Sequence, residues 1–102
     1  MTEKLLKIIN HYGIKHQIRK FNEEAFELME AIIQFEDDLY YAIEPEILEK
    51  AKEHIEEELT DCYVMLEEIR LFYDIYLSRI SKRGRFKIDR QLNRMEKEKN
   101  GK

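Results

Sequence analysis

Two pairs of carboxylates at acid-x-x-acid spacing are the residues of this chain best placed to do chemistry. Glu24 precedes Glu27 by three positions, and Glu58 precedes Asp61 by the same interval. On a helix, side chains three residues apart are surface neighbours, with roughly 5–6 Å between their Cβ atoms. Facing helices would bring the four carboxylates together, where buried negative charge is costly unless a partner neutralises it. Because these candidate ligands are all oxygen atoms, Mg²⁺ or Mn²⁺ is the simplest expected partner.

The helical period places both pairs at the edge of an apolar stripe. At about 100° per residue, Glu24 borders one stripe and Glu58 lies within about 40° of another. The neighbouring Glu23 and Glu57 point elsewhere and are expected to be solvated. Taken singly, a glutamate at a stripe edge is better explained as a structural residue whose side chain reaches water. The same relation in both segments favours one shared site.

Four helical segments are needed to position these acids. Gly13 and Gly84 are expected to end helices, Pro45 suits a first helical turn, and Thr2 suits an N-cap. A connection at 39–44 separates the second and third segments, and 98–102 is expected to fray. The predicted helices cover about 2–12, 14–38, 46–81 and 85–97.

The composition agrees with a single all-α domain over 1–102 with a four-helix, bundle-type fold. The 102 residues are 39% charged and include three glycines and one proline. A chain of this size cannot cover all its apolar positions, so oligomerisation to a homodimer or homotetramer is expected to complete the bundle. The single cysteine, Cys62, excludes an internal disulfide. With no signal-like or membrane-spanning segment expected, a cytoplasmic protein without membrane contacts is the default.

The charge is divided unevenly along the chain. Residues 1–78 have a balance of −11 and residues 79–102 a balance of +7, within a net charge of −4. Lys87 and Arg90 share one face of the last helix, which could bind phosphate. The apolar Ile88, Leu92 and Met95 are expected to dock this helix onto the bundle. The alternative is a solvated basic end with weak nucleic-acid affinity, but the acidic bulk of the chain counts against stable nucleic-acid binding.

These motifs together resemble a known family. Glu24-Ala25-Phe26-Glu27 followed by Glu58-Leu59-Thr60-Asp61 resembles the ExxE…ExxD signature of the MazG-like, all-α nucleoside triphosphate pyrophosphatases. The flanks 17–24 and 57–62 are also similar, as is the basic stretch 87–91. The likeness covers roughly residues 14–95.

The resemblance implies hydrolysis of a nucleoside triphosphate between its α- and β-phosphates, giving the monophosphate and pyrophosphate. Glu24, Glu27, Glu58 and Asp61 would be the Mg²⁺ ligands and catalytic residues, and which glutamate orients or deprotonates the water is left open. Lys87 and Arg90 would stabilise the leaving pyrophosphate, and Gln17 and Lys20 would contact the nucleotide. The competing interpretation is a non-catalytic helical interaction module with an acidic bundle and a basic tail.

Overall fold

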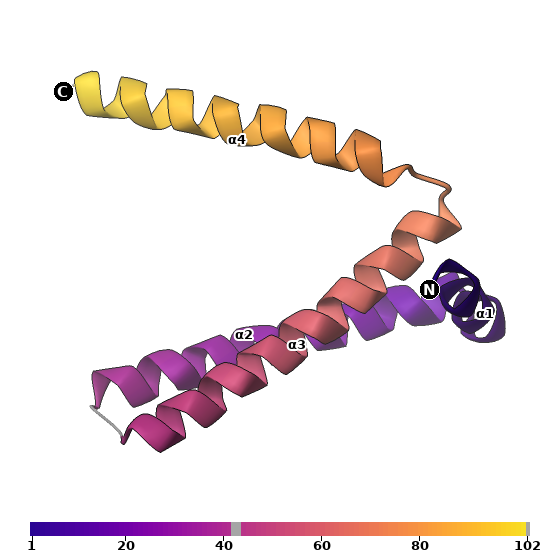
Figure 1. The fold of residues 1–102 in the computed structure, drawn as a ribbon, viewed down its shortest axis with the longest axis horizontal. Coiled ribbons are helices and arrows are strands. Elements are labelled where there is room, and N and C mark those ends of the chain that lie inside the picture. The colour runs from indigo at the N-terminus through magenta and orange to yellow at the C-terminus, as the bar shows by residue number, and fades with distance from the viewer. Residues whose placement is uncertain (42–43, 102) are drawn as a thin grey trace.

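Helices make up almost the whole chain. The computed structural model describes residues 1–41 and 44–101, and among these it contains no strand (Figure 1). The prediction of an all-α, four-helix fold is therefore confirmed. The helices are α1 (Thr2–Tyr12), α2 (Ile14–Tyr40), α3 (Pro45–Phe72) and α4 (Leu77–Asn100).

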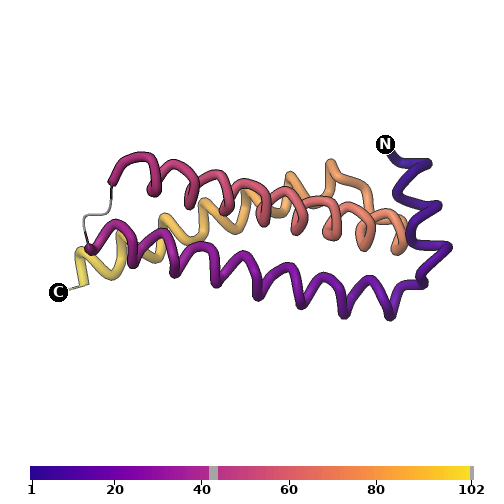
Figure 2. The backbone as a smooth tube through the Cα atoms, turned by 90° about the horizontal axis from the view of Figure 1, so that it is seen from below, coloured from indigo at the N-terminus to yellow at the C-terminus, as the bar shows by residue number. Residues whose placement is uncertain are grey.

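An antiparallel pair of long helices, α2 and α3, forms the body of the molecule (Figures 1 and 2). Helix α1 packs across the end of this pair where α2 begins and α3 ends. The core is small: α1 contributes Leu5 and Ile9, and the pair contributes Ala31, Cys62 and Met65. Packing of α2 against α3 is what brings the two acidic pairs to one place.

The turn between α1 and α2 depends on Gly13. Its φ of 86° lies in the left-handed region, and its N–H donates to the carbonyl of Ile9 at 2.7 Å. Glycine enters this region without the steric cost of a side chain, so the predicted stop at Gly13 is confirmed. The predicted N-cap is wrong by one residue, because Met1 occupies that position and Thr2 is already helical.

Helix α3 ends at Phe72 and does not continue to residue 81 as predicted. Asp74 adopts φ 53°, and the N–H groups of Asp74 and Ile75 donate to the carbonyls of Leu71 and Arg70. This is a Schellman ending, with Asp74 in the left-handed position that usually belongs to glycine. The Arg70 guanidinium also donates to the Ile75 carbonyl at 2.8 Å. The apolar period continues past residue 72 without interruption. The sequence pattern therefore gave no sign that a left-handed backbone conformation at Asp74 would end the helix.

Helix α4 is longer than predicted and runs through Gly84. A mid-helix glycine costs only about 1 kcal/mol relative to alanine, so the surrounding helix-forming residues outweigh it. The predicted start at Arg85 is therefore wrong, and so is fraying from residue 98, since the helix extends to Asn100. Of the predicted connection 39–44, residues 39 and 40 are helical and residues 42–43 lie outside the described part, as does Lys102 of the predicted frayed end.

Helix α4 diverges from the α2–α3 pair after the turn at 73–76 and buries none of its residues (Figure 1). The expected docking of Ile88, Leu92 and Met95 onto the bundle is therefore wrong within one chain, since these side chains are 61%, 52% and 52% exposed. The Cα radius of gyration is 18.1 Å, against about 13 Å for a compact chain of this length. The fold positions the acidic pairs but leaves the basic helix separate.

Candidate metal centre

Three of the four predicted carboxylates meet at the interface between α2 and α3. Glu24 and Glu27 project from α2 and Glu58 from α3, and one potential ligand oxygen from each lies within 4.8 Å of the others. We call these three residues the carboxylate cluster. Oxygen atoms at this mutual separation from two helices can bind one hard divalent cation.

Two oxygens of the cluster are buried without a hydrogen-bond partner among the described residues. They are the Oε2 atoms of Glu24 and Glu58. Glu58 is only 9% exposed, so water does not replace the missing partners freely. An unsatisfied buried carboxylate oxygen costs on the order of 1–3 kcal/mol or more. The orphaned oxygens are thus the structural observation that fits a bound cation.

Electrostatic strain in the cluster appears in the proton affinity of Glu24. Burial raises the pKa of Glu24 above its ordinary value, and the negative charges of Glu27 and Asp61 raise it further. Lys20 acts in the opposite direction, and Glu58 adds a smaller upward contribution. Desolvation and like charge both disfavour the ionised carboxylate.

Asp61, the fourth predicted ligand, lies at the edge of the cluster. It is exposed and lines a surface hollow with Lys20, Glu24 and Met65. Beneath the acids is Cys62, whose buried thiol has a pKa raised by burial and then by the charges of all four carboxylates. Asp61 therefore adds negative potential to the site from its rim, and Cys62 is a buried thiol close enough to sense all four charges.

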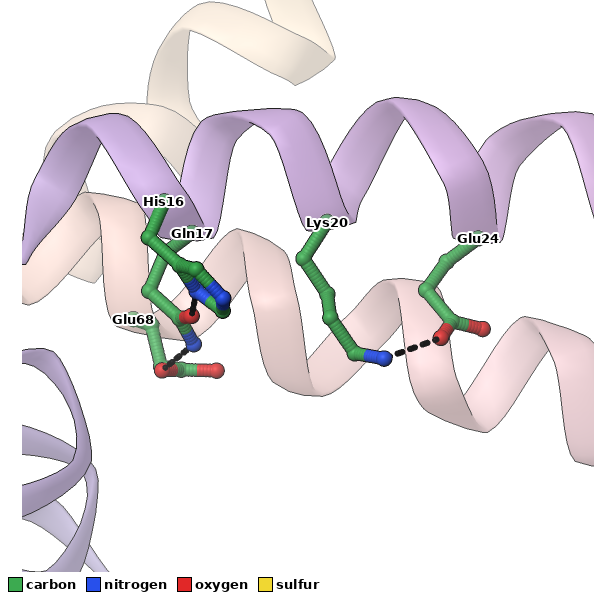
Figure 3. A network of polar contacts seen from close by, with 5 residues as sticks. All are labelled: His16, Gln17, Lys20, Glu24 and Glu68. Atoms are coloured by element: carbon green, nitrogen blue, oxygen red, sulfur yellow. Dashed lines mark hydrogen bonds and ion pairs between the residues drawn. The ribbon is translucent and has the colours of Figure 1, made fainter. Parts of the chain in front are cut away.

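Two basic side chains each hold one oxygen of the cluster from one helical turn away. Lys20 Nζ lies 3.8 Å from Glu24 Oε1, as Figure 3 shows, and His54 Nε2 lies 3.2 Å from Glu58 Oε1. Both basic side chains are about half exposed. Glu24 and Glu58 thus each have one oxygen oriented by a basic side chain on the same helix and one oxygen without a partner among the described residues.

Gln17, predicted to contact the nucleotide, has a different setting. It is 4% exposed and donates from Nε2 to Glu68 Oε1 at 2.8 Å, while its own Oε1 lies 2.7 Å from His16 Nδ1 (Figure 3). Both ends of its amide are therefore engaged within the protein. Glu68 is almost completely buried, at 2% exposed.

The Gln17–Glu68 bond marks the register in which the two acidic pairs face each other. Gln17 precedes Glu24 by seven residues, and Glu68 follows Asp61 by seven. In an antiparallel helix pair, a step of two turns along one helix is matched by an equal step back along the other. The bond therefore places Glu24 opposite Asp61, and by the same register Glu27 lies opposite Glu58. Both pairings agree with the cluster geometry and with the effect of Asp61 on the pKa of Glu24.

Sequence reasoning missed Glu68 although a signal was present. Two helical turns beyond Asp61, it falls on the same face of α3, so the acidic pattern continues past the ExxD pair. It was overlooked because Glu67 and Glu68 look like ordinary surface acids in a charged helix. Glu67 is also buried and pairs with Arg70, which in turn holds the end of α3.

Lys87 and Arg90 do not join the cluster within one chain. Both lie on α4, which has no buried residue among those described and packs far less on the other helices than these pack on one another. The structure therefore assembles the acidic half of the predicted site and leaves its basic half on a separate helix.

Comparison with protein-family models, with curated proteins and with solved structures gives no match for this chain. The resemblance to the MazG-like family thus rests on the motifs quoted above. Among the described residues, no helix has the length and apolar character needed to cross a membrane.

Proposed function

We propose that this chain is a Mg²⁺-dependent nucleoside triphosphate pyrophosphohydrolase that cleaves between the α- and β-phosphates and releases a monophosphate and pyrophosphate. One observation carries the proposal: the free, buried Oε2 atoms of Glu24 and Glu58 occur in a three-carboxylate cluster. The ExxE and ExxD motifs that supply the cluster also support it, because their sequence context resembles the MazG-like enzymes.

The donor set fits a hard cation. Glu24, Glu27 and Glu58 would hold Mg²⁺ or Mn²⁺ through oxygen, with Asp61 available at the rim. When bound, such an ion polarises a phosphoryl oxygen and lowers the pKa of a coordinated water. His54 orients Glu58, and Lys20 orients Glu24 while presenting a positive charge beside the site. Lys20 would in this way place one positive charge beside a phosphate bound at the metal.

A second copy of the chain is the proposed source of the remaining positive charge. Helix α4 has a balance of +6 over Leu77–Asn100, whereas residues 1–76 have a balance of −11. Its exposed apolar side chains and its charge both complement the acidic α2–α3 pair of another molecule. We therefore propose a homo-oligomer in which α4 of one copy packs on the α2–α3 pair of another. Lys87 then lies on the side of the packed α4.

The direct test is turnover of each common and deaminated nucleoside triphosphate, with Mg²⁺ or with EDTA, followed by quantification of monophosphate and pyrophosphate. We expect Mg²⁺-dependent release of pyrophosphate that falls at least about 100-fold in Glu58→Gln, since a lost ligand should cost at least as much as a lost outer-shell partner. The matched control is Glu57→Gln, which removes a neighbouring but exposed carboxylate and should retain turnover.

Thermal unfolding with Mn²⁺ separates metal binding from catalysis. A ligand at about 100 times its Kd stabilises the folded state by about 2.7 kcal/mol, and Glu58→Gln should lose that gain while Glu57→Gln keeps it. Metal stabilisation without turnover of any triphosphate would contradict the proposed reaction. Absence of both would reject the metal centre and favour the non-catalytic interaction module.

A further inference from the structure

Helix α4 carries a basic surface of which only Lys87, at its edge, enters the proposed hydrolysis. Its lining residues, which we call the basic stripe, are Arg79, Lys82, Arg83, Phe86, Lys87 and Arg90. Arg79 and Arg90 are eleven residues apart, so the stripe extends about 17 Å along the helix. No acidic side chain lines this surface. Such a surface is suited to a polyanion that is longer than one phosphate group.

Phe86 lies in the middle of the stripe and is 67% exposed. At about 100° per residue, four of the five basic side chains fall within about 60° of it, and so does one acid, Asp89, which does not line the surface. The other large apolar side chains of α4 lie at least about 120° away, and they are Leu77, Ile80, Ile88, Leu92 and Met95. Phe86 is therefore on the wrong face to help α4 pack, and its ring is presented to solvent among positive charges.

The acidic part of the chain does not neutralise the stripe. Helix α4 buries no residue and diverges from α2 and α3 (Figure 1). If its apolar side packs on a second copy, the stripe still lies one helix diameter away, about 10–12 Å. Charges at that separation are largely screened, because the Debye length is about 8 Å at physiological ionic strength. The acidic bulk of the chain counted against stable nucleic-acid binding, but that charge is on α1, α2 and α3, from which α4 diverges.

We propose that the basic stripe of α4 binds single-stranded nucleic acid, with phosphates on the arginine and lysine side chains and a base stacked on Phe86. Exposed aromatics within a positive groove are the usual platform for unpaired bases. A membrane surface fits less well, because a helix that lies on lipid has its aromatic side chains on the face opposite its cations. Here Phe86 lies among the cations.

The test is fluorescence anisotropy of the full chain with labelled oligothymidylate and oligouridylate of about 15 nucleotides, within the usual range of site sizes. We expect Phe86→Ala to weaken binding about tenfold, as the loss of one stacked base predicts. Arg83→Gln should reduce the slope of log affinity against log salt by about 0.7, the value for one phosphate contact on a single strand. Arg85→Gln removes the same charge two residues away but off the stripe, and it should leave the slope unchanged.

Both Arg83 and Phe86 are exposed, so their variants should keep the far-ultraviolet circular dichroism of the parent chain. A preference for either oligomer assigns DNA or RNA as the ligand, and both results support the proposal. Equal effects of Arg83→Gln and Arg85→Gln would overturn it, since binding would then reflect diffuse charge. It would also be overturned if inorganic polyphosphate competed as well as oligothymidylate and Phe86→Ala had no effect. Binding only to anionic phosphatidylserine vesicles would reassign α4 to membranes.

Discussion

Glu24 is the cluster residue in which the fold alters acid–base behaviour most clearly. One of its oxygens is paired with Lys20 and the other is buried without a partner. Its residue type and spacing were readable from the sequence, but its raised pKa results from burial against α3 and from three carboxylates on two helices. In that environment burial and like charge destabilise the ionised carboxylate, and a bound cation would stabilise it.

The raised pKa of Glu24 predicts how stability depends on pH in the absence of metal. The folded state binds the Glu24 proton more tightly than the unfolded state, so this contribution is fully present below the ordinary value of 4.5. It is lost as the pH rises through the higher pKa of the folded state. In EDTA, the wild type should therefore lose stability relative to Glu24→Gln as the pH rises from 4.5 through the pKa of folded Glu24. The free energy of unfolding of the variant minus that of the wild type should increase over this pH range. Chemical denaturation at several pH values measures it.

The neighbouring Glu23 supplies the control, because it is exposed on the same helix. Glu23→Gln, measured in parallel, shows what removal of one carboxylate charge from α2 does by itself. A pH-independent difference for Glu24→Gln would contradict the assignment of electrostatic strain to this residue.

At the scale of the elements, the antiparallel pair α2–α3 decides whether the two acidic motifs form one site. The buried Gln17–Glu68 hydrogen bond lies two turns from Glu24 and Asp61, and we expect it to help hold the register of the pair. Apolar packing alone tolerates sliding better than a buried polar pair does, because a shifted register leaves the polar groups unpaired. The same bond explains why Gln17 faces inward and is unavailable to a nucleotide.

Removal of one member of this pair should destabilise the fold more than removal of both. Gln17→Leu leaves the Glu68 carboxylate buried without its donor, and we expect a loss of about 1–3 kcal/mol. Gln17→Leu combined with Glu68→Met should recover part of that loss. A double-mutant cycle by urea denaturation measures the coupling, expected at about 0.5–3 kcal/mol. A coupling near zero would show that the register depends on apolar packing alone.

The whole molecule does not bury an adequate core by itself. Its buried apolar residues are few, while large side chains such as Phe26, Met29 and Tyr63 on α2 and α3 are more than half exposed. Helix α4 has no buried residue and the Cα radius of gyration is 18.1 Å, and both observations also indicate that one chain does not form a compact core. Exposed apolar surface on this scale is typical of a chain whose packing is completed by another molecule.

We expect this chain to self-associate with a mass that is a multiple of 12.5 kDa. Leu92→Glu replaces an apolar side chain of α4 with a charge and should weaken association by at least about tenfold, because a charge would be buried at the interface. Asn93→Glu makes the same charge change on the opposite face and should leave association intact. Sedimentation equilibrium over a range of concentrations compares the two variants. Equal masses for both would show that the apolar face of α4 is not the interface.

Much of the fold follows from local pattern. The helical period, Gly13 and Pro45 predicted α1, α2 and the start of α3, because these signals act within a few residues. The same signals failed at Asp74 and Gly84. An aspartate in the left-handed position ends a helix although the apolar period continues, and an isolated glycine is too weak a breaker to divide α4.

The sequence by itself determined the acid-x-x-acid spacing, the helices that carry it and the separation of negative from positive charge, because all three depend on residue type and helical period. Tertiary structure alone decided which acids meet. Glu24, Glu27 and Glu58 converge and Asp61 stays at the rim, since that outcome depends on a register set by Gln17 and Glu68, which are 51 residues apart. It also decided that Lys87 and Arg90 remain away from the cluster. The reason is that the backbone turn at Asp74, and not the amphipathic pattern of α4, sets the direction of the last helix.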